Sequence, residues 1–200
     1  MKLVVISGCN VTWVEKLIPA CDISEQIALA SREACGTVNM KCMLNGAVTI
    51  GTDDGSNAMI RDLVGTDRTY LFGHRAEEIA ALTEAGTYSP SRIYGQSETV
   101  REAVDFILSP DLLEIGDRYV LQRLYDRLTG TDPAMDLLDL EDYIRTRDRI
   151  LADYEDRDRW QRMMLVNIAR AGGFSSDNTA ETYNERIWGL KREVRSRDWF

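Results

Sequence analysis

Short apolar runs alternate with helical segments over the first 85 residues, and this alternation limits the possible folds more than any other feature of the sequence. The runs are rich in β-branched, aliphatic or aromatic side chains, which favour strands. They are residues 3–7, 47–52 and 69–73. Strands that alternate with helices are typical of βαβ units, so we expect a parallel sheet with helices on its faces.

Local signals place the helices between these runs. Thr12 and Glu15 have the spacing of a capping box, so a short helix is expected there, with its end at Pro19. The further helices are expected over residues 24–34, over residues 39–44 with Thr37 as N-cap, and from Asp54 or Ser56 to Val64. Ligands of such sheets bind beyond the carboxyl ends of the strands, so the loops after Ile6 and before Thr37 are the expected places for a site.

The pattern from residue 77 onward is helical throughout. Apolar residues recur at helical spacing in six segments, which are residues 77–85, 98–108, 118–128, 140–153, 156–171 and 179–190. We therefore expect an α/β fold, namely a partial doubly wound parallel sheet of about three strands followed by a helical C-terminal region. Residues 1–200 are interpreted as one unit, with an α/β part over 1–88 and a helical part over 89–200, because three strands need helices to cover both faces.

The loop and helix around Gly36, Thr37 and Lys41 carry the strongest chemical signal. A glycine before a helix N-terminus lets the backbone come close to a ligand, and the free N–H groups of that terminus attract a phosphate. Lys41 follows one turn later, where its amine can hold a carbonyl cofactor as a Schiff base. The pattern alone favours an ordinary loop-to-helix junction with an exposed lysine, because it lacks the full phosphate-loop motif.

The amino-acid sequence of this segment resembles that of a known family. Residues 33–57 read EACGTVNMKCMLNGAVTIGTDDGSN, which resembles the pyridoxal-phosphate lysine segment EASGTGNMKxxLNGAxTxGTxDGAN of the α-glucan (glycogen, starch and maltodextrin) phosphorylases. Upstream, EKLIPA and DISEQ at residues 15–20 and 22–26 resemble its EKxIPAADxSEQ. Further matches are NIA at 167–169, FSSD at 174–177 and IWG at 187–189. The resemblance therefore covers nearly the whole chain in order.

The resemblance implies a role for individual residues. Lys41 matches the cofactor lysine, and Gly36, Thr37 and Val38 match the loop that approaches the cofactor and substrate phosphates. Lys41 and Thr37 are thus the candidate catalytic residues. Cys9 stands where the family carries a tyrosine near the cofactor. Glu33, Ala34, Cys35 and Gly36 match the residues that bind the glucose unit, whereas Glu33 alone also fits an exposed carboxylate at a helix end.

The resemblance also implies an architecture and a reaction. The chain matches part of the C-terminal, cofactor-binding domain of a GT-B type glycosyltransferase. The implied reaction converts an α-1,4-glucan and phosphate into glucose-1-phosphate and a shortened glucan, with the phosphate of pyridoxal phosphate passing the proton. The family's glucan-binding half and its phosphate-binding basic residues have no match here, so we do not expect the chain alone to catalyse phosphorolysis. Two alternatives remain: a degenerate non-catalytic relative, and one chain of a split enzyme that acts with a protein partner.

Composition excludes other classes. The net charge of −9 disfavours nucleic acid and anionic membranes as partners. Four cysteines without a Cys-x-x-Cys spacing and a single histidine, His74, predict free thiols and no metal site. His74 follows an expected strand, where a histidine more often packs or caps than catalyses. The sequence shows no targeting signal, which favours the cytoplasm.

Overall fold

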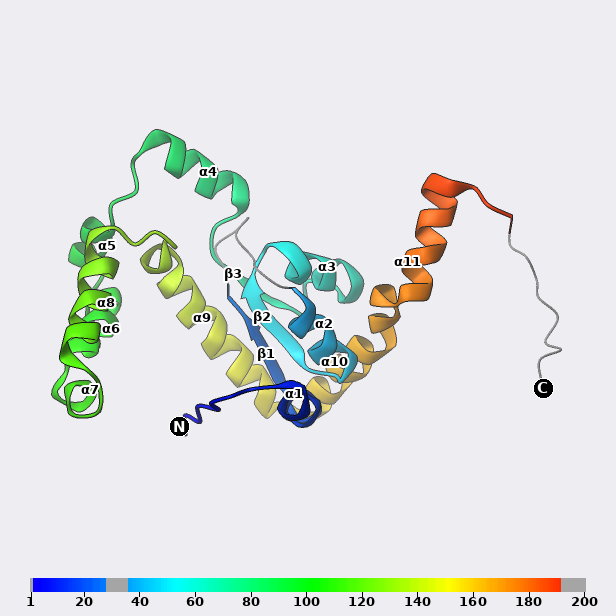
Figure 1. The fold of residues 1–200 in the computed structure, drawn as a ribbon, viewed down its shortest axis with the longest axis horizontal. Coiled ribbons are helices and arrows are strands. Elements are labelled where there is room, and N and C mark those ends of the chain that lie inside the picture. Colours follow the sequence, from blue (N-terminus) through cyan, green and yellow to red (C-terminus); the bar gives the residue numbers. More distant parts are fainter. Residues whose placement is uncertain (1, 28–35, 192–200) are drawn as a thin grey trace.

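The chain folds around a three-stranded parallel sheet. The computed structural model describes residues 2–27 and 36–191. The sheet consists of β1 (Ile23–Gln26), β2 (Val48–Thr52) and β3 (Tyr70–Phe72) in that spatial order, with Ile23 opposite Val48 and Ile50 opposite Tyr70. A mostly helical region follows (Figure 1). The expected fold class, α/β with three parallel strands before a helical region, is confirmed.

The helices of the first half surround this sheet or extend the chain beyond it. In chain order they are α1 (Val11–Leu17), η1 (Ile18–Ala20), α2 (Thr37–Leu44), α3 (Gly55–Val64), α4 (Ala76–Ala85), α5 (Pro90–Gln96), α6 (Glu98–Asp105), η2 (Phe106–Leu108) and α7 (Pro110–Ile115). Those of the second half are α8 (Arg118–Gly130), α9 (Asp136–Glu155), α10 (Arg157–Arg170), η3 (Ala171–Phe174), α11 (Ser176–Tyr183) and η4 (Asn184–Trp188).

Helices cover both faces of the sheet, which explains why β2 is buried at every residue. On one face, side chains of β2 and β3 pack against α9 and α10 in a cluster that includes Ile50, Tyr70 and the fully buried Trp160. On the other side, Met43 of α2 and Ile60 of α3 form a second cluster with η3 (Figure 1). This two-sided burial is what a parallel strand requires.

Helices α5, α6 and α8 form a separate group that packs against the start of α9, at the left of Figure 1. The buried Asp132 connects this group to α9. Its carboxylate accepts hydrogen bonds from the backbone N–H groups of Asp136 (3.0 Å) and Leu137 (2.9 Å) and from the hydroxyl of Tyr88. Carboxylates at a helix N-terminus satisfy N–H groups that have no intrahelical partner, so Asp132 fixes where α9 begins.

Two of the expected elements near the N-terminus are wrong. Residues 3–7 form no strand but an exposed extended segment, because no neighbouring strand pairs with them in the described part of the chain. Residues 24–26, expected to begin a helix, belong to β1 instead. Their pairing with β2 outweighs the local helix preference of Ser-Glu-Gln. Residues 28–34 of that expected helix lie outside the described residues.

Three local signals were also misread. The side chain of Asn10, not Thr12, caps α1 by accepting a hydrogen bond from the N–H of Trp13 (3.3 Å). Gly36 is the N-cap of α2, and Thr37 is its first helical residue. Pro90 and Pro110 lie between the expected helices, but each is the first residue of a helix (α5 and α7). Proline is accepted there because the first helical residue does not need its N–H for an intrahelical hydrogen bond.

Candidate functional site

The sequence-predicted lysine lies on α2, whose buried side anchors it to the rest of the chain. Asn39, Cys42 and Met43 are buried, whereas Thr37 and Lys41 are exposed. Thr37 and Lys41 are four residues apart and therefore share one face of the helix. Because the Cα–Cβ bonds of a helix tilt toward its N-terminus, the Lys41 side chain leaves the helix on the side of the turn that Thr37 begins.

A buried network of amide side chains fixes the start of α2. The Asn39 side-chain amide donates to Ser56 Oγ (2.7 Å) and Asn57 Oδ1 (2.8 Å), both at the start of α3. Asn57 Nδ2 in turn donates to the carbonyls of Thr52 (2.9 Å) and Gln26 (3.1 Å), the last residues of β2 and β1. The network therefore ties two helix N-termini to the carboxyl ends of two strands, which we call the amide network (Asn39, Ser56 and Asn57).

Gly51 explains why this junction is so close. A Cβ at Gly51 would lie 2.2 Å from the Gln26 carbonyl oxygen and 2.4 Å from Asn57 Nδ2. Only glycine leaves room there, because such contacts are shorter than any real Cβ contact. Gly51 is thus a packing requirement of the amide network, which supports the start of α2.

A contact from the helical region also supports α2. Asn167 of α10 is fully buried and donates through Nδ2 to the carbonyl of Ala47 (2.8 Å), between α2 and β2. The two residues are 120 positions apart in sequence. The blocks that carry the family resemblance at residues 36–57 and 167–169 are therefore in contact in the fold.

The structure brings four of the predicted site residues together and leaves others apart or undescribed. Gly36, Thr37, Val38 and Lys41 occupy the first turns of α2. Val38 is in helical conformation and 48% exposed, so its backbone needs no positive φ. Cys9 lies in the exposed segment before α1, which leads to the start of β1 rather than to its carboxyl end (Figure 1). Glu33, Ala34 and Cys35 lie outside the described residues.

A cleft that sequence reasoning missed opens at the carboxyl edge of the sheet, between the strands and α9. We call it the α9 cleft; its volume is about 350 Å³. Ile27, Thr52 and Phe72, at the ends of the three strands, line one side. Asp136 and Tyr143 of α9 are among the residues that line the other. Parallel sheets commonly bind ligands at this edge.

Two titratable groups of the α9 cleft are perturbed by their surroundings. Burial and the nearby carboxylates of Asp132 and Asp139 raise the pKa of Asp136, although Arg127 opposes this effect. Burial, with a hydrogen bond to Glu25, raises the pKa of Tyr143 to about 12. Both shifts favour the neutral form, so this cleft disfavours additional negative charge.

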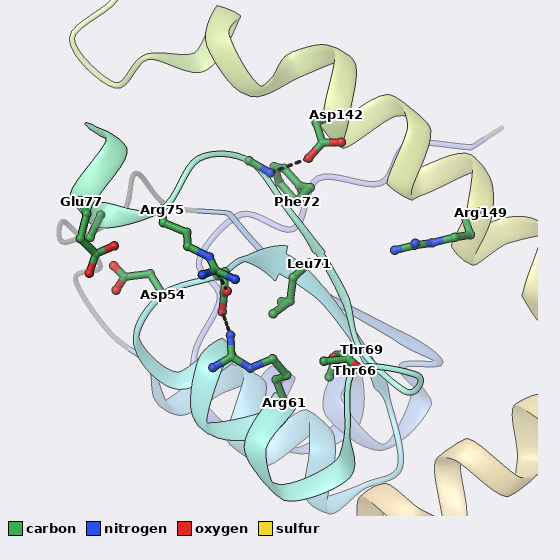
Figure 2. A pocket seen from close by; sticks show the side chains of 13 residues that line it. Asp54, Arg61, Thr66, Thr69, Leu71, Phe72, Arg75, Glu77, Asp142 and Arg149 are labelled. Carbon is green, nitrogen blue, oxygen red and sulfur yellow. Dashed lines mark hydrogen bonds and ion pairs between the residues drawn. The ribbon is translucent and has the colours of Figure 1, made fainter. Parts of the chain in front are cut away.

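A larger pocket of about 690 Å³ lies beside β3, and we call it the β3 pocket. Arg61 of α3, Arg75 at the start of α4 and Arg149 of α9 extend into it (Figure 2). Asp53 forms ion pairs with Arg61 and with Arg75 (3.6 Å), while the guanidinium of Arg149 stacks 5.2 Å from the ring centroid of Tyr70. The contact between Arg149 and Tyr70 joins α9 to β3, and the pocket contains none of the predicted site residues.

His74 pairs with Asp139 of α9. Its ring Nδ1 lies 2.6 Å from Asp139 Oδ1, and the same oxygen accepts the backbone N–H of His74 at 3.1 Å. Among residues 2–27 and 36–191 no cluster of three or more potential ligands could hold a metal ion. Cys9, Cys21 and Cys42 are free thiols. No described helix combines the length and apolar character needed to cross a membrane.

Comparison with known proteins places these features in a family. Residues 1–190 match the family model described as carbohydrate phosphorylase. This chain belongs to the carbohydrate phosphorylase family. Among its phosphorylase relatives, the maltodextrin phosphorylase of Streptococcus pneumoniae serotype 4 is 50% identical over 190 residues, which are 95% of this chain and 25% of that protein.

Glycogen phosphorylases are also similar. That of Bacillus subtilis is 39% identical over 192 residues (96% of this chain, 24% of that protein), and the human muscle form is 36% identical over 191 residues (96% and 22%). The chain thus spans about a quarter of the length of these phosphorylases.

Proposed function

We propose that this chain is the cofactor-binding part of an α-1,4-glucan phosphorylase, with pyridoxal phosphate attached at Lys41. The proposal is supported by membership of the phosphorylase family and by the position of Lys41 on the exposed face of α2. The relatives are named as maltodextrin or glycogen phosphorylases. We accordingly infer that the substrates are an α-glucan and inorganic phosphate and that the product is glucose-1-phosphate.

The residues at the start of α2 fit a cofactor that carries both an aldehyde and a phosphate. Gly36 has no side chain to shield the helix N-terminus, and Thr37 and Val38 follow it on the exposed side. Thr37 and Lys41 are four residues apart, which is a rise of about 6 Å along the helix axis. The N-terminal N–H groups and the helix dipole favour a phosphate, while the Lys41 amine can bind the aldehyde. When bound, the cofactor supplies a phosphate that titrates near neutral pH.

In this proposal the protein holds the cofactor in place. The amide network fixes the helix start relative to the sheet, and Asn167 fixes Ala47, between α2 and β2. Lys41 then sets the position of the cofactor ring, and Thr37 that of its phosphate. Glu33, Ala34, Cys35 and Gly36 are proposed to bind the glucose unit.

We further propose that catalysis needs the phosphorylase portion that this chain does not span. The chain corresponds to a quarter of its relatives, and the basic residues that hold the substrate phosphate in the family have no match in this sequence. The isolated chain is therefore expected to bind the cofactor without releasing glucose-1-phosphate from glycogen or maltodextrin.

Reductive trapping tests the proposal. The chain has only four lysines, Lys2, Lys16, Lys41 and Lys191, so peptide mapping resolves each of them. After incubation with pyridoxal phosphate and borohydride, we expect the label at Lys41, at least about tenfold above the other lysines. Lys41→Ala should lose it, and the matched variant Lys16→Arg, on exposed α1, should keep it. Equal labelling of all lysines in folded protein would overturn the proposal.

A degenerate, non-catalytic relative is the second candidate, and Val38 is the observation that favours it. The family pattern has glycine there, whereas this chain places a branched side chain on the helix N-terminus at 48% exposure. Val38→Gly distinguishes the two. If labelling of Lys41 is weak in the natural chain and rises severalfold in Val38→Gly, the valine obstructs the cofactor and the degenerate relative is favoured.

A further inference from the structure

Two cysteines from separate elements are in contact beneath α2. Cys42 lies on the buried side of that helix, directly after Lys41 in sequence, and Cys21 follows η1 just before β1. Half-buried Cys21 packs against Cys42 in a cluster that also contains Ile18 and Ala47. The two cysteine side chains are hydrogen-bonded to each other. A pair of thiols is therefore held together within mainly apolar surroundings.

The backbone holds both cysteines against the same dipeptide. The carbonyl of Cys42 accepts a hydrogen bond from the N–H of Ala47 (3.0 Å). The carbonyl of Asp22, the residue after Cys21, accepts one from the N–H of Val48 (3.0 Å). Ala47 and Val48 are both fully buried. The proximity of the two thiols thus follows from backbone hydrogen bonds of the core and not from side-chain rotamers alone.

The pair belongs to this chain and not to the family pattern. The pattern EKxIPAADxSEQ has alanine at the position of Cys21, and the position of Cys42 is variable in EASGTGNMKxxLNGA. Because alanine is accepted at position 21 in the pattern, packing does not require a thiol there. Two thiols in contact therefore indicate a chemical property that this chain has in addition to its shared fold.

The contact changes the acidity of both thiols. The hydrogen bond with Cys21 lowers the pKa of Cys42; burial opposes this effect, and a hydrogen bond with Ser24 adds to it. The hydrogen bond with Cys42, together with burial, raises the pKa of Cys21. The pair therefore loses its first proton more readily than its second, and the remaining thiol stabilises the thiolate. A thiolate is the form of cysteine that attacks peroxides and disulfides.

We propose that Cys21 and Cys42 form a reversible disulfide when the chain is exposed to a peroxide, and that this bridge fastens α2 to the start of β1. Two sulfur atoms in hydrogen-bond contact need only a small movement to reach the S–S bond length of about 2.05 Å. The bridge would lie one residue from Lys41, on the buried side of the helix. It would thus stabilise α2 without occupying the exposed face.

The reaction is balanced by the peroxide. The thiolate of the pair attacks one oxygen of hydrogen peroxide, and hydroxide leaves, so that this sulfur becomes a sulfenic acid. The proton released when the thiolate formed joins that hydroxide as water. The second thiol then attacks the sulfenic sulfur, and its proton leaves with the hydroxyl group as a second water. Two thiols are oxidised to one disulfide, and one peroxide is reduced to two waters.

Peptide mapping under non-reducing conditions tests the proposal. Trypsin places the four cysteines in four different peptides, which are residues 3–16, 17–32, 33–41 and 42–61. After the folded chain has reacted with hydrogen peroxide, we expect peptide 17–32 linked to peptide 42–61, at least about tenfold above any other link, and dithiothreitol should remove this link. Absence of the link in folded protein overturns the proposal. So do links to Cys9 or Cys35 of equal abundance.

Variants test the effect of the bridge on α2. In the natural chain the urea midpoint of unfolding should rise by roughly 1 M after oxidation, because the bridge closes a loop of about 20 residues in the unfolded state. Cys21→Ala, which introduces the residue of the family pattern, should fold by circular dichroism and show no such rise. The matched control Cys9→Ser, in the exposed segment before α1, should keep both the link and the rise. A bridged chain with an unchanged midpoint refutes the fastening of α2.

The outcome is separable from that of the cofactor test, because bridge formation needs no pyridoxal phosphate. Lys41 labelling in a chain that forms no bridge supports the proposed function and overturns the disulfide. A bridge between Cys21 and Cys42 without a label at Lys41 supports the disulfide and overturns cofactor binding.

Discussion

Replacing Asn57 by alanine tests whether the amide network holds the site together. The Asn57 side chain makes two buried hydrogen bonds and one partly buried hydrogen bond. It donates to the carbonyl of Thr52 (2.9 Å) and accepts from Asn39 (2.8 Å), and the partly buried bond is its donation to the carbonyl of Gln26 (3.1 Å). A buried hydrogen bond contributes about 1 kcal/mol net, so we expect Asn57→Ala to lower the free energy of unfolding by about 3 kcal/mol. That is a large share of the roughly 5–15 kcal/mol typical of a domain.

Ser56→Ala is the matched control. It removes one hydroxyl beside Asn39, and alanine is the residue in the family pattern, so the expected loss is about 1 kcal/mol. Urea unfolding followed by circular dichroism measures both variants, and the slope against urea should remain unchanged. If Asn57→Ala lowers the free energy of unfolding no more than Ser56→Ala does, the amide network does not stabilise the junction between strands and helices. The reasoning about how α2 is positioned would then fail.

Three further predictions follow from packing and titration. Gly51→Ala should cost about 3 kcal/mol or more in urea unfolding, because its Cβ would lie 2.2 Å from the Gln26 carbonyl oxygen. Trp160→Ala should lower the free energy of unfolding by about 4 kcal/mol, because Trp160 is fully buried. Trp160→Phe should lower it much less, because the buried Trp160 Nε1 has no hydrogen-bond partner to lose. The pKa of Tyr143, raised to about 12 by burial, means that its contribution to stability is complete below about pH 10 and falls as pH rises toward 12. Tyr143→Phe should therefore lose less stability than the natural chain over that interval, measured by urea unfolding at each pH.

The sequence predicts those parts of the fold that depend on local patterns. Residues 47–52 and 69–73 are apolar and β-branched or aromatic, and β2 and β3 form there. The expected start of α2 was displaced by one position only, because Gly36 and Thr37 are both acceptable N-caps. The α/β class follows from the same alternation, since it needs only the order of elements.

Elements that depend on distant partners were not predictable in this way. β1 consists of Ile-Ser-Glu-Gln, so three of its four residues are polar. They form a strand only because β2 provides the backbone hydrogen bonds. The α9 cleft joins the ends of the strands to Asp136 and Tyr143, which lie 64 residues or more farther along the chain. The amide network could not be predicted from the sequence either, because Asn39 and Asn57 resemble ordinary loop or cap residues and come into contact only in the fold.

The contact between Asn167 and Ala47 shows why the helical region matters to a site that lies on α2. Asn167 is fully buried and its amide supplies the hydrogen bond that the Ala47 carbonyl needs between α2 and β2. A buried carbonyl without a partner costs about 1–3 kcal/mol, so this junction is stable only while α10 is in place. The segment that carries Lys41 and the segment at residues 167–169 therefore stabilise each other. Support for the segment that carries Lys41 therefore comes from a helix about 120 positions farther along the chain.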